Sequence, residues 1–235
     1  PSSTITSAQW QAFLFELQTT PAPLFVNVSG VSSFSVQTSV TFQAPASIVV
    51  GNLLLAVVFL QTAAQTPSTP AGWTLGNTIQ NGSGSTLAWF WKVADSTIFG
   101  THVSSWSSSS NVLSFTYQFK QTDTAAPIGA LSQAEGNGTT VAVGSINTTR
   151  ADSTVLGWVW GNTALPPLPS GFLQRDSKSF GTGNGRLTID QILVSGTASP
   201  AISVTIASGN WKAYQIKLLS PPVPRPRRQI IINRR

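Results

Sequence analysis

The chain contains no cysteine. Without thiolates it can form neither disulfides nor the sulfur-ligated zinc and iron sites. It also contains a single histidine, His102, so a Ser-His-Asp triad or a histidine-rich metal centre would depend on this one residue. No nucleophile turn of the Gly-x-Ser-x-Gly type surrounds it. We therefore expect His102 to be an ordinary surface or turn histidine.

Charge is scarce along the whole chain. Only 9% of the 235 residues are charged, against about 25% in an average globular domain. This neutral composition fits strands with uncharged outer faces, as in extracellular or virion proteins, and is unlike that of a cytosolic enzyme. The carboxylates are scattered one per segment, at Glu16, Asp95, Asp123, Glu135, Asp152, Asp176 and Asp190. Their spacing favours neither a glycosidase pair nor a calcium loop, so we expect no enzyme activity, no metal and no cofactor.

No apolar run is long enough to cross a bilayer. The most apolar stretch, residues 48–60, is interrupted by Gly51 and Asn52, whereas a spanning helix needs about 20 apolar residues. The first residues also lack the positive and apolar regions of a signal peptide. We therefore expect no membrane partner.

The N-terminal segment, residues 1–32, has the one helical pattern of the chain. Its apolar residues recur at i, i+3, i+4 and i+7, at Trp10, Phe13, Leu14 and Leu17. Thr6 or Ser7 can cap the helix, and Pro21 and Pro23 end it. We expect a short helix here, with its apolar stripe packed on its own domain or on a partner subunit.

Residues 33–220 show strand after strand, separated by turns rich in Gly, Ser and Asn. The expected strands are 34–42, 53–60, 87–93, 112–119, 140–146, 154–160, 187–194, 201–206 and 211–219. About ten or eleven short strands at such spacing indicate an all-β, antiparallel β-sandwich, jelly-roll-like in its connections. We expect no repeat of fixed period.

Eight tryptophans raise the question of sugar binding. Trp89 and Trp91 share one face of a strand, and Trp158 and Trp160 share one face of another. These pairs either fill a thick core or leave one member exposed in a groove, and we favour the core. Trp106 lies in a serine-rich segment, and we expect it to be exposed there as the candidate glycan-binding residue.

The C-terminal arm, residues 221–235, holds five of the thirteen Lys and Arg residues and none of the seven carboxylates. Its prolines exclude helix and inner strand. The arm has three readings: contact with nucleic acid, contact with its own body, and addition of a strand to a neighbour's sheet while arginines pair with carboxylates. We favour the third over nucleic acid. The candidate partner-binding residues are Arg225, Arg227, Arg228, Ile230, Ile231, Ile232, Arg234 and Arg235.

Several short motifs also resemble a known family. They are Gly51-Asn52-Leu53-Leu54-Leu55-Ala56, Pro70-Ala71-Gly72-Trp73-Thr74-Leu75, Leu87 to Asp95, Pro169-Ser170-Gly171-Phe172 and Gly209-Asn210-Trp211-Lys212-Ala213. In this order they resemble a β-sandwich domain of bacteriophage virion proteins, found in tail, fibre and other structural components. The resemblance covers roughly residues 33–220. It implies a sandwich fold and brings no catalytic residues.

These expectations combine into one functional hypothesis. The chain is expected to be a non-enzymatic structural protein of a phage virion, either a capsid decoration or a minor capsid protein, attached through its terminal segments. Its partners are then other virion proteins and copies of itself, and it is assembled in the host cytoplasm. The alternatives are a minor tail or fibre protein, and a carbohydrate-binding adhesin that recognises a glycan of the host surface.

Overall fold

A computed structural model gives the fold of most of the chain. It describes residues 21–31, 36–61, 65–81, 85–147, 153–161, 166–180, 184–193 and 198–222. The expected N-terminal helix lies outside these residues, as does the C-terminal arm from residue 223 onward. The described part contains eleven strands and no helix. The expectation of an all-β, antiparallel protein is therefore confirmed for this part.

The first sheet is built from the first half of the chain. Its strands are β1 (Leu24–Val31), β2 (Val36–Thr41), β3 (Leu53–Leu60), β4 (Thr74–Asn81), β5 (Ser85–Val93) and β6 (Val103–Lys120). Their order is β1-β6-β3-β5-β4, with β2 paired to β6, and every pair is antiparallel.

The second sheet is built from the second half. Its strands are β7 (Ile128–Val143), β8 (Ser153–Gly161), β9 (Leu173–Phe180), β10 (Asn184–Leu193) and β11 (Ile202–Leu218). Their order is β7-β11-β8-β10-β9, again antiparallel throughout.

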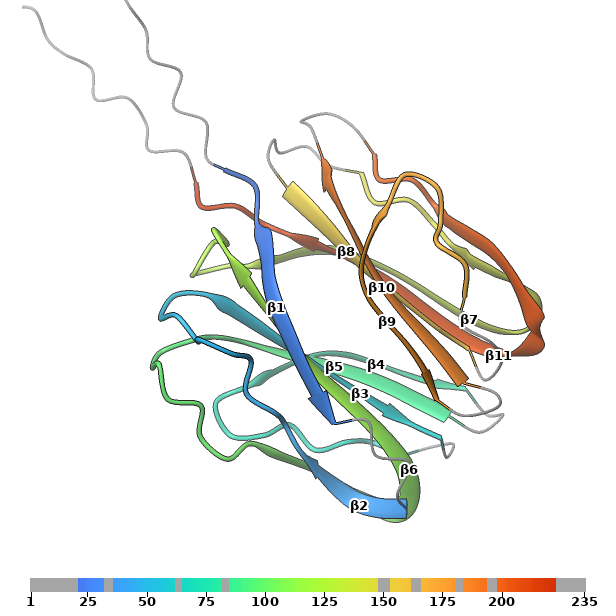
Figure 1. The fold of residues 1–235 in the computed structure, drawn as a ribbon, viewed down its shortest axis with the longest axis horizontal. Helices are drawn as coiled ribbons and strands as arrows, with labels where there is room; N and C mark the ends of the chain where they lie inside the picture. The colour runs from blue at the N-terminus through green and yellow to red at the C-terminus, as the bar shows by residue number, and fades with distance from the viewer. Residues whose placement is uncertain are drawn as a thin grey trace, which may run out of the picture.

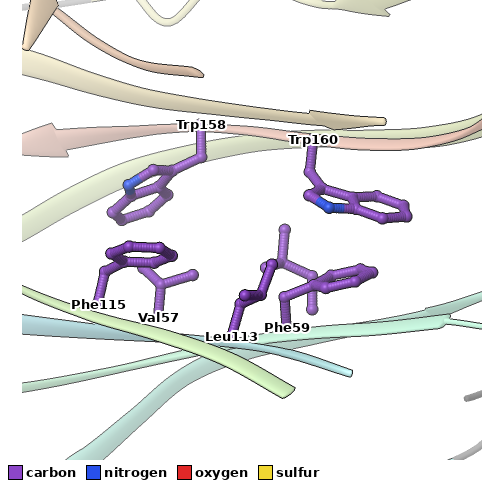
Figure 2. A pocket seen from close by; sticks show the side chains of 7 residues that line it. Val57, Phe59, Leu113, Phe115, Trp158 and Trp160 are labelled. Atoms are coloured by element: carbon purple, nitrogen blue, oxygen red, sulfur yellow. The ribbon is translucent and has the colours of Figure 1, made fainter. Parts of the chain in front are cut away.

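The two sheets face each other across one large apolar cluster (Figure 1). Alternate residues of each strand point into it, so Leu53, Leu55 and Val57 lie in this inner cluster. Figure 2 shows Trp158 and Trp160 of β8 across from side chains of β3 and β6. The cavity left between them has a volume of about 10 Å³ and is lined by apolar side chains.

Each sheet also has its outer face covered. The long strands β6 and β11 fold over, so that their first parts form an outer ribbon with β2 and with the end of β7. The outer cluster of the first sheet therefore joins Leu54 and Val58 of β3 to Val40 and Trp106 of the ribbon. Because β3 is buried on both faces, all eight of its residues are apolar.

The order of the strands corrects one expectation. In a jelly roll, built of two Greek keys, connections pass between the sheets, whereas here each half of the chain completes its own sheet. Both halves also place their five main strands in the same order. Sequence periodicity missed this since equivalent positions differ in residue type and their spacing drifts.

Candidate functional site

Both ends of the described chain emerge at the same end of the molecule (Figure 1). The hydroxyl of Thr154, at the start of β8, donates a hydrogen bond to the carbonyl of Pro23. Thr154 also pairs with Leu218, near the end of β11. Pro23 and Leu218 therefore both lie beside Thr154. We call this end of the molecule the terminal end.

The connection between the two sheets, residues 121–127, lies at the terminal end as well. The backbone N–H of Asp123 donates to the carbonyl of Leu219 at 2.7 Å, and the N–H of Leu219 donates to the carbonyl of Pro127 at 2.9 Å. The Asp123 carboxylate accepts bonds from the N–H groups of Ala125 and Ala126 at 2.9 and 3.2 Å. The exit of the chain after β11 is therefore held by a network of backbone hydrogen bonds.

Two further loops, residues 42–52 and 94–102, meet at the terminal end beside the start of β3. The N–H of Gly51 donates to the carbonyl of Ala94, and the N–H of Ala94 donates to that of Asn52, both at 2.8 Å. These loops expose three large aliphatic side chains: Val49 is 54% exposed, Val50 56% and Ile98 81%. We call these three residues the terminal apolar residues.

His102 lies at the base of the second loop, partly buried. Its ring meets the rings of Trp73 and Phe99 edge-on, with centroids 5.6 and 4.8 Å apart. Burial lowers the pKa of His102, and the charge of Lys92 adds to the effect. The imidazole is therefore neutral at neutral pH, and its ring contacts are those of a packed turn residue.

Asp95, in the second of these loops, forms an ion pair with a neighbouring lysine. Asp95 pairs with Lys92 at 3.3 Å. A backbone hydrogen bond, and then Lys92, lower the pKa of Asp95.

Within the described ranges no group of three or more His, Asp or Glu residues is placed to hold a metal ion. No helix among the described residues is long and apolar enough to span a membrane.

The expectation that Trp106 is exposed is wrong. Its side chain belongs to the outer cluster of the first sheet and is only 7% exposed. Its indole N–H donates to the carbonyl of Gln37 at 3.0 Å. The reason is the folding over of β6, which turns Trp106 toward the sheet while Ser105 and Ser107 on either side of it are exposed. Trp106 therefore offers no free ring face for a sugar.

The other tryptophan prediction is confirmed. Trp89, Trp158 and Trp160 are 2–3% exposed in the inner cluster, and Trp91 packs partly buried against it. The indole N–H groups of Trp89, Trp158 and Trp160 have no hydrogen-bond partner among the described residues. These tryptophans thus contribute apolar area to the core.

The arginine and isoleucine residues proposed to bind a partner lie beyond residue 222, outside the described part. The terminal apolar residues are functional candidates that only the structure reveals. In the sequence, Val49 and Val50 belong to the same apolar stretch, 48–60, as the residues of β3. The signal that separates them is Gly51, whose φ of 85° marks a turn before the strand. Ile98 stands alone between Thr97 and Phe99, where no periodicity marks it.

Comparisons of the chain with known protein families, with curated proteins and with solved structures each gave no match. Three features of the chain itself therefore bear on its function. They are the shared exit of both terminal segments, the terminal apolar residues, and the uneven distribution of positive charge along the sequence.

Proposed function

We propose that this chain is a non-enzymatic structural protein of a bacteriophage virion, attached through its terminal segments as a capsid decoration or minor capsid protein. The observation that carries the proposal is the shared exit of both segments at the terminal end. Residues 1–20 and 223–235 are joined to neighbouring points of the two-sheet body. Both can therefore engage one partner surface while the opposite end of the molecule points away from it.

The charge distribution supports attachment through the arm. Five of the thirteen basic residues lie in residues 221–235, which leaves eight basic and seven acidic residues in the remainder. Arginine pairs with carboxylates in bidentate geometry, and its guanidinium is more weakly hydrated than an ammonium group. A nearly neutral body with a basic arm is suited to a protein surface that carries carboxylates.

The isoleucines of the arm suit a sheet edge. Ile230, Ile231 and Ile232 form a β-branched run, and such a run can add a strand to an exposed edge through main-chain hydrogen bonds. Within the described part, β4 and β9 each end a sheet. A copy of the same protein, or another virion protein with such an edge, is the proposed acceptor. The terminal apolar residues would be covered by the same contact.

The alternatives predict different binding. A minor tail or fibre protein would use the same attachment but bind tails instead of shells. A glycan-binding adhesin would bind host cells with or without the arm. The burial of Trp106 removes the aromatic residue on which the adhesin hypothesis depended.

The test is binding of the purified chain to particles of the phage that encodes it. Full-length protein and a variant ending at Pro222 are sedimented with empty shells, with isolated tails and with host cells. Ending at Pro222 keeps the buried Ser220 and the hydrogen bonds of Leu219, so both proteins are expected to have the same melting temperature.

We expect the full chain to sediment with shells and the shortened chain to remain in the supernatant. A variant with all five arm arginines replaced by glutamine keeps the length of the arm and should bind more weakly, with less dependence on salt. Equal binding of the full and shortened chains would contradict attachment through the arm. Binding to host cells alone would favour the adhesin.

A further inference from the structure

We propose that the chain is a tandem duplication of one β-unit, and that the inner sheet face of each unit is the association surface for the other unit. Unit 1 comprises residues 24–120 and unit 2 comprises residues 128–218. This inference is independent of the proposed function. It rests on four kinds of correspondence between the units.

The first correspondence is topological. The strands β1, β3, β4, β5 and β6 of unit 1 take the same places as β7, β8, β9, β10 and β11 of unit 2. The outer ribbon is also shared: β2 pairs with the first part of β6, and the end of β7 pairs with the first part of β11. Strand β7 thus combines the roles of β1 and β2, and β11 repeats the fold-over of β6.

The second correspondence is an irregularity of the ladder. In β4 the register skips Gly76, between Leu75 and Asn77. In β9 it skips Arg175, between Gln174 and Asp176. The two bulges lie 99 residues apart, on equivalent edge strands. A bulge is a local feature that the order of the five strands does not require. Its presence in both edge strands therefore supports the duplication independently of the strand order.

The third correspondence is the turn before each edge strand. Pro70-Ala71-Gly72-Trp73 and Pro169-Ser170-Gly171-Phe172 are also 99 residues apart. Gly72 and Gly171 have φ of 78° and 84°, a conformation that glycine adopts without steric cost. In each turn the N–H of the aromatic residue donates to the proline carbonyl, and the aromatic side chain is buried.

The fourth correspondence is in the connections. Unit 2 is entered through Thr124-Ala125-Ala126-Pro127-Ile128, and unit 1 through the similar sequence Thr20-Pro21-Ala22-Pro23-Leu24.

The contacts between the units follow the pattern of a twofold interface, in which equivalent residues face each other. Phe59 of β3 and Trp160 of β8 hold equivalent positions, and their rings stack with centroids 3.7 Å apart (Figure 2). Away from this stack, a contact between β4 and β7 is matched by a contact between the equivalent strands β9 and β1. Asn77 of β4 bonds Gln133 of β7 at 2.7 Å, and Arg175 of β9 lies over Phe25 of β1.

The side chains of this interface have diverged in a complementary way. Val57 is equivalent to Trp158, and Phe115 to Tyr214, whose hydroxyl donates to the carbonyl of Leu87 in unit 1. The ladder pairs Val57 with Phe115 and Trp158 with Tyr214. Val57 of unit 1 thus holds the position that the much larger Trp158 holds in unit 2, so the two inner faces are related but no longer identical.

The first test cuts the folded full-length chain. A specific protease site is inserted between Thr124 and Ala125, or, as a control, between Thr97 and Ile98 in an exposed loop within unit 1. Each protein is cleaved, unfolded in denaturant, refolded by dilution and weighed by native mass spectrometry. We expect the pieces cut at residue 124 to reassociate one to one, and those cut at residue 97 to fail. Equal reassociation of both, or failure of the first, would overturn the proposal.

The second test exchanges the equivalent stacked residues in the uncut chain. Phe59→Trp places two indoles in the stack, and Trp160→Phe leaves a gap. The double variant restores one large and one small ring with their positions reversed. We expect each single variant to lower the melting temperature and the double variant to recover most of the loss. Losses that simply add in the double variant would show that the two positions are not equivalent.

Discussion

At the scale of single residues, Lys212 shows how this protein treats buried charge. Its side chain is fully buried on β11, and its ammonium meets the Glu135 carboxylate at 3.3 Å. Burial lowers the pKa of Lys212, and Glu135 opposes that shift only in part. The Glu135 side chain is 35% exposed, so the ammonium of Lys212 is the charge that is removed from water, at a cost that one ion pair of ordinary geometry does not fully offset. The equivalent position in unit 1 is Leu113, an apolar residue of the inner cluster.

The first prediction follows from the sign of this shift. Because the folded state binds the proton of Lys212 more weakly than the unfolded state, stability rises with pH as the solution passes from the lowered pKa toward 10.5. Lys212→Leu removes this pH-dependent contribution to the free energy of unfolding. Because the remaining Glu135 carboxylate is 35% exposed and stays hydrated, we expect the substitution to be neutral or to stabilise the protein by about 1 kcal/mol at pH 7.

The measurement is urea unfolding of both proteins at pH 7 and pH 10. The difference between them should shrink at the higher pH. Tyr214, whose pKa burial raises, is present in both proteins and acts in the opposite direction. A difference that is unchanged between the two pH values would contradict the account of Lys212.

Residue patterns in the sequence were sufficient to predict the burial of some side chains and not of others. The alternation of Trp158 and Trp160 on one strand face predicted their place in the core, because period two is a property of the strand itself. Trp106 was misplaced because its environment is created by β6 folding over the sheet. No local pattern records that fold-over.

At the scale of elements, central strands were predictable and edge strands were not. The expected bounds of β3 match the observed ones, since a strand buried on both faces is a continuous apolar run. β4 and β9 contain the bulges at Gly76 and Arg175, which break the alternation on which strand prediction depends. β1 lies in the N-terminal segment, where no strand is expected from the sequence, and the two strands expected at 201–206 and 211–219 are one strand, β11.

The second prediction concerns the face that joins the sheets. Trp158 is 2% exposed and lies against the rings of Trp89, Tyr117 and Tyr214. We expect Trp158→Ala to lower the free energy of unfolding by about 3–5 kcal/mol, the cost of deleting a large buried aromatic. Leu173→Ala, at a 59% exposed position of the same sheet, should change it by less than about 0.5 kcal/mol.

Guanidinium unfolding followed by circular dichroism gives both values. Similar small effects of the two substitutions would mean that the inner cluster does not hold the sheets together, and the two-layered account would be wrong.

At the scale of the whole molecule, the arrangement of the two units and the shared exit of the terminal segments depend on long-range contacts. Thr154 lies 131 residues from Pro23 along the chain, and no local signal in the sequence places them together. The arm itself was identified from composition alone, because its prolines, arginines and isoleucines contrast with a nearly neutral body. Its contacts stay a prediction.

In the proposed attachment, the terminal end faces the virion. The chain contains no cysteine, so a single introduced thiol reports on one position. Val50→Cys places a thiol at a 56% exposed site of the terminal end, and Ser109→Cys places one at an exposed site near the far end of β3. Both substitutions should leave stability nearly unchanged, as exposed sites usually do.

The measurement is the rate of maleimide labelling of each variant, free and bound to phage particles. Both thiols should react readily in the free protein. We predict that binding protects Cys at position 50 and leaves Cys at position 109 as reactive as before. Protection at position 109 with free reaction at position 50 would contradict attachment through the terminal end.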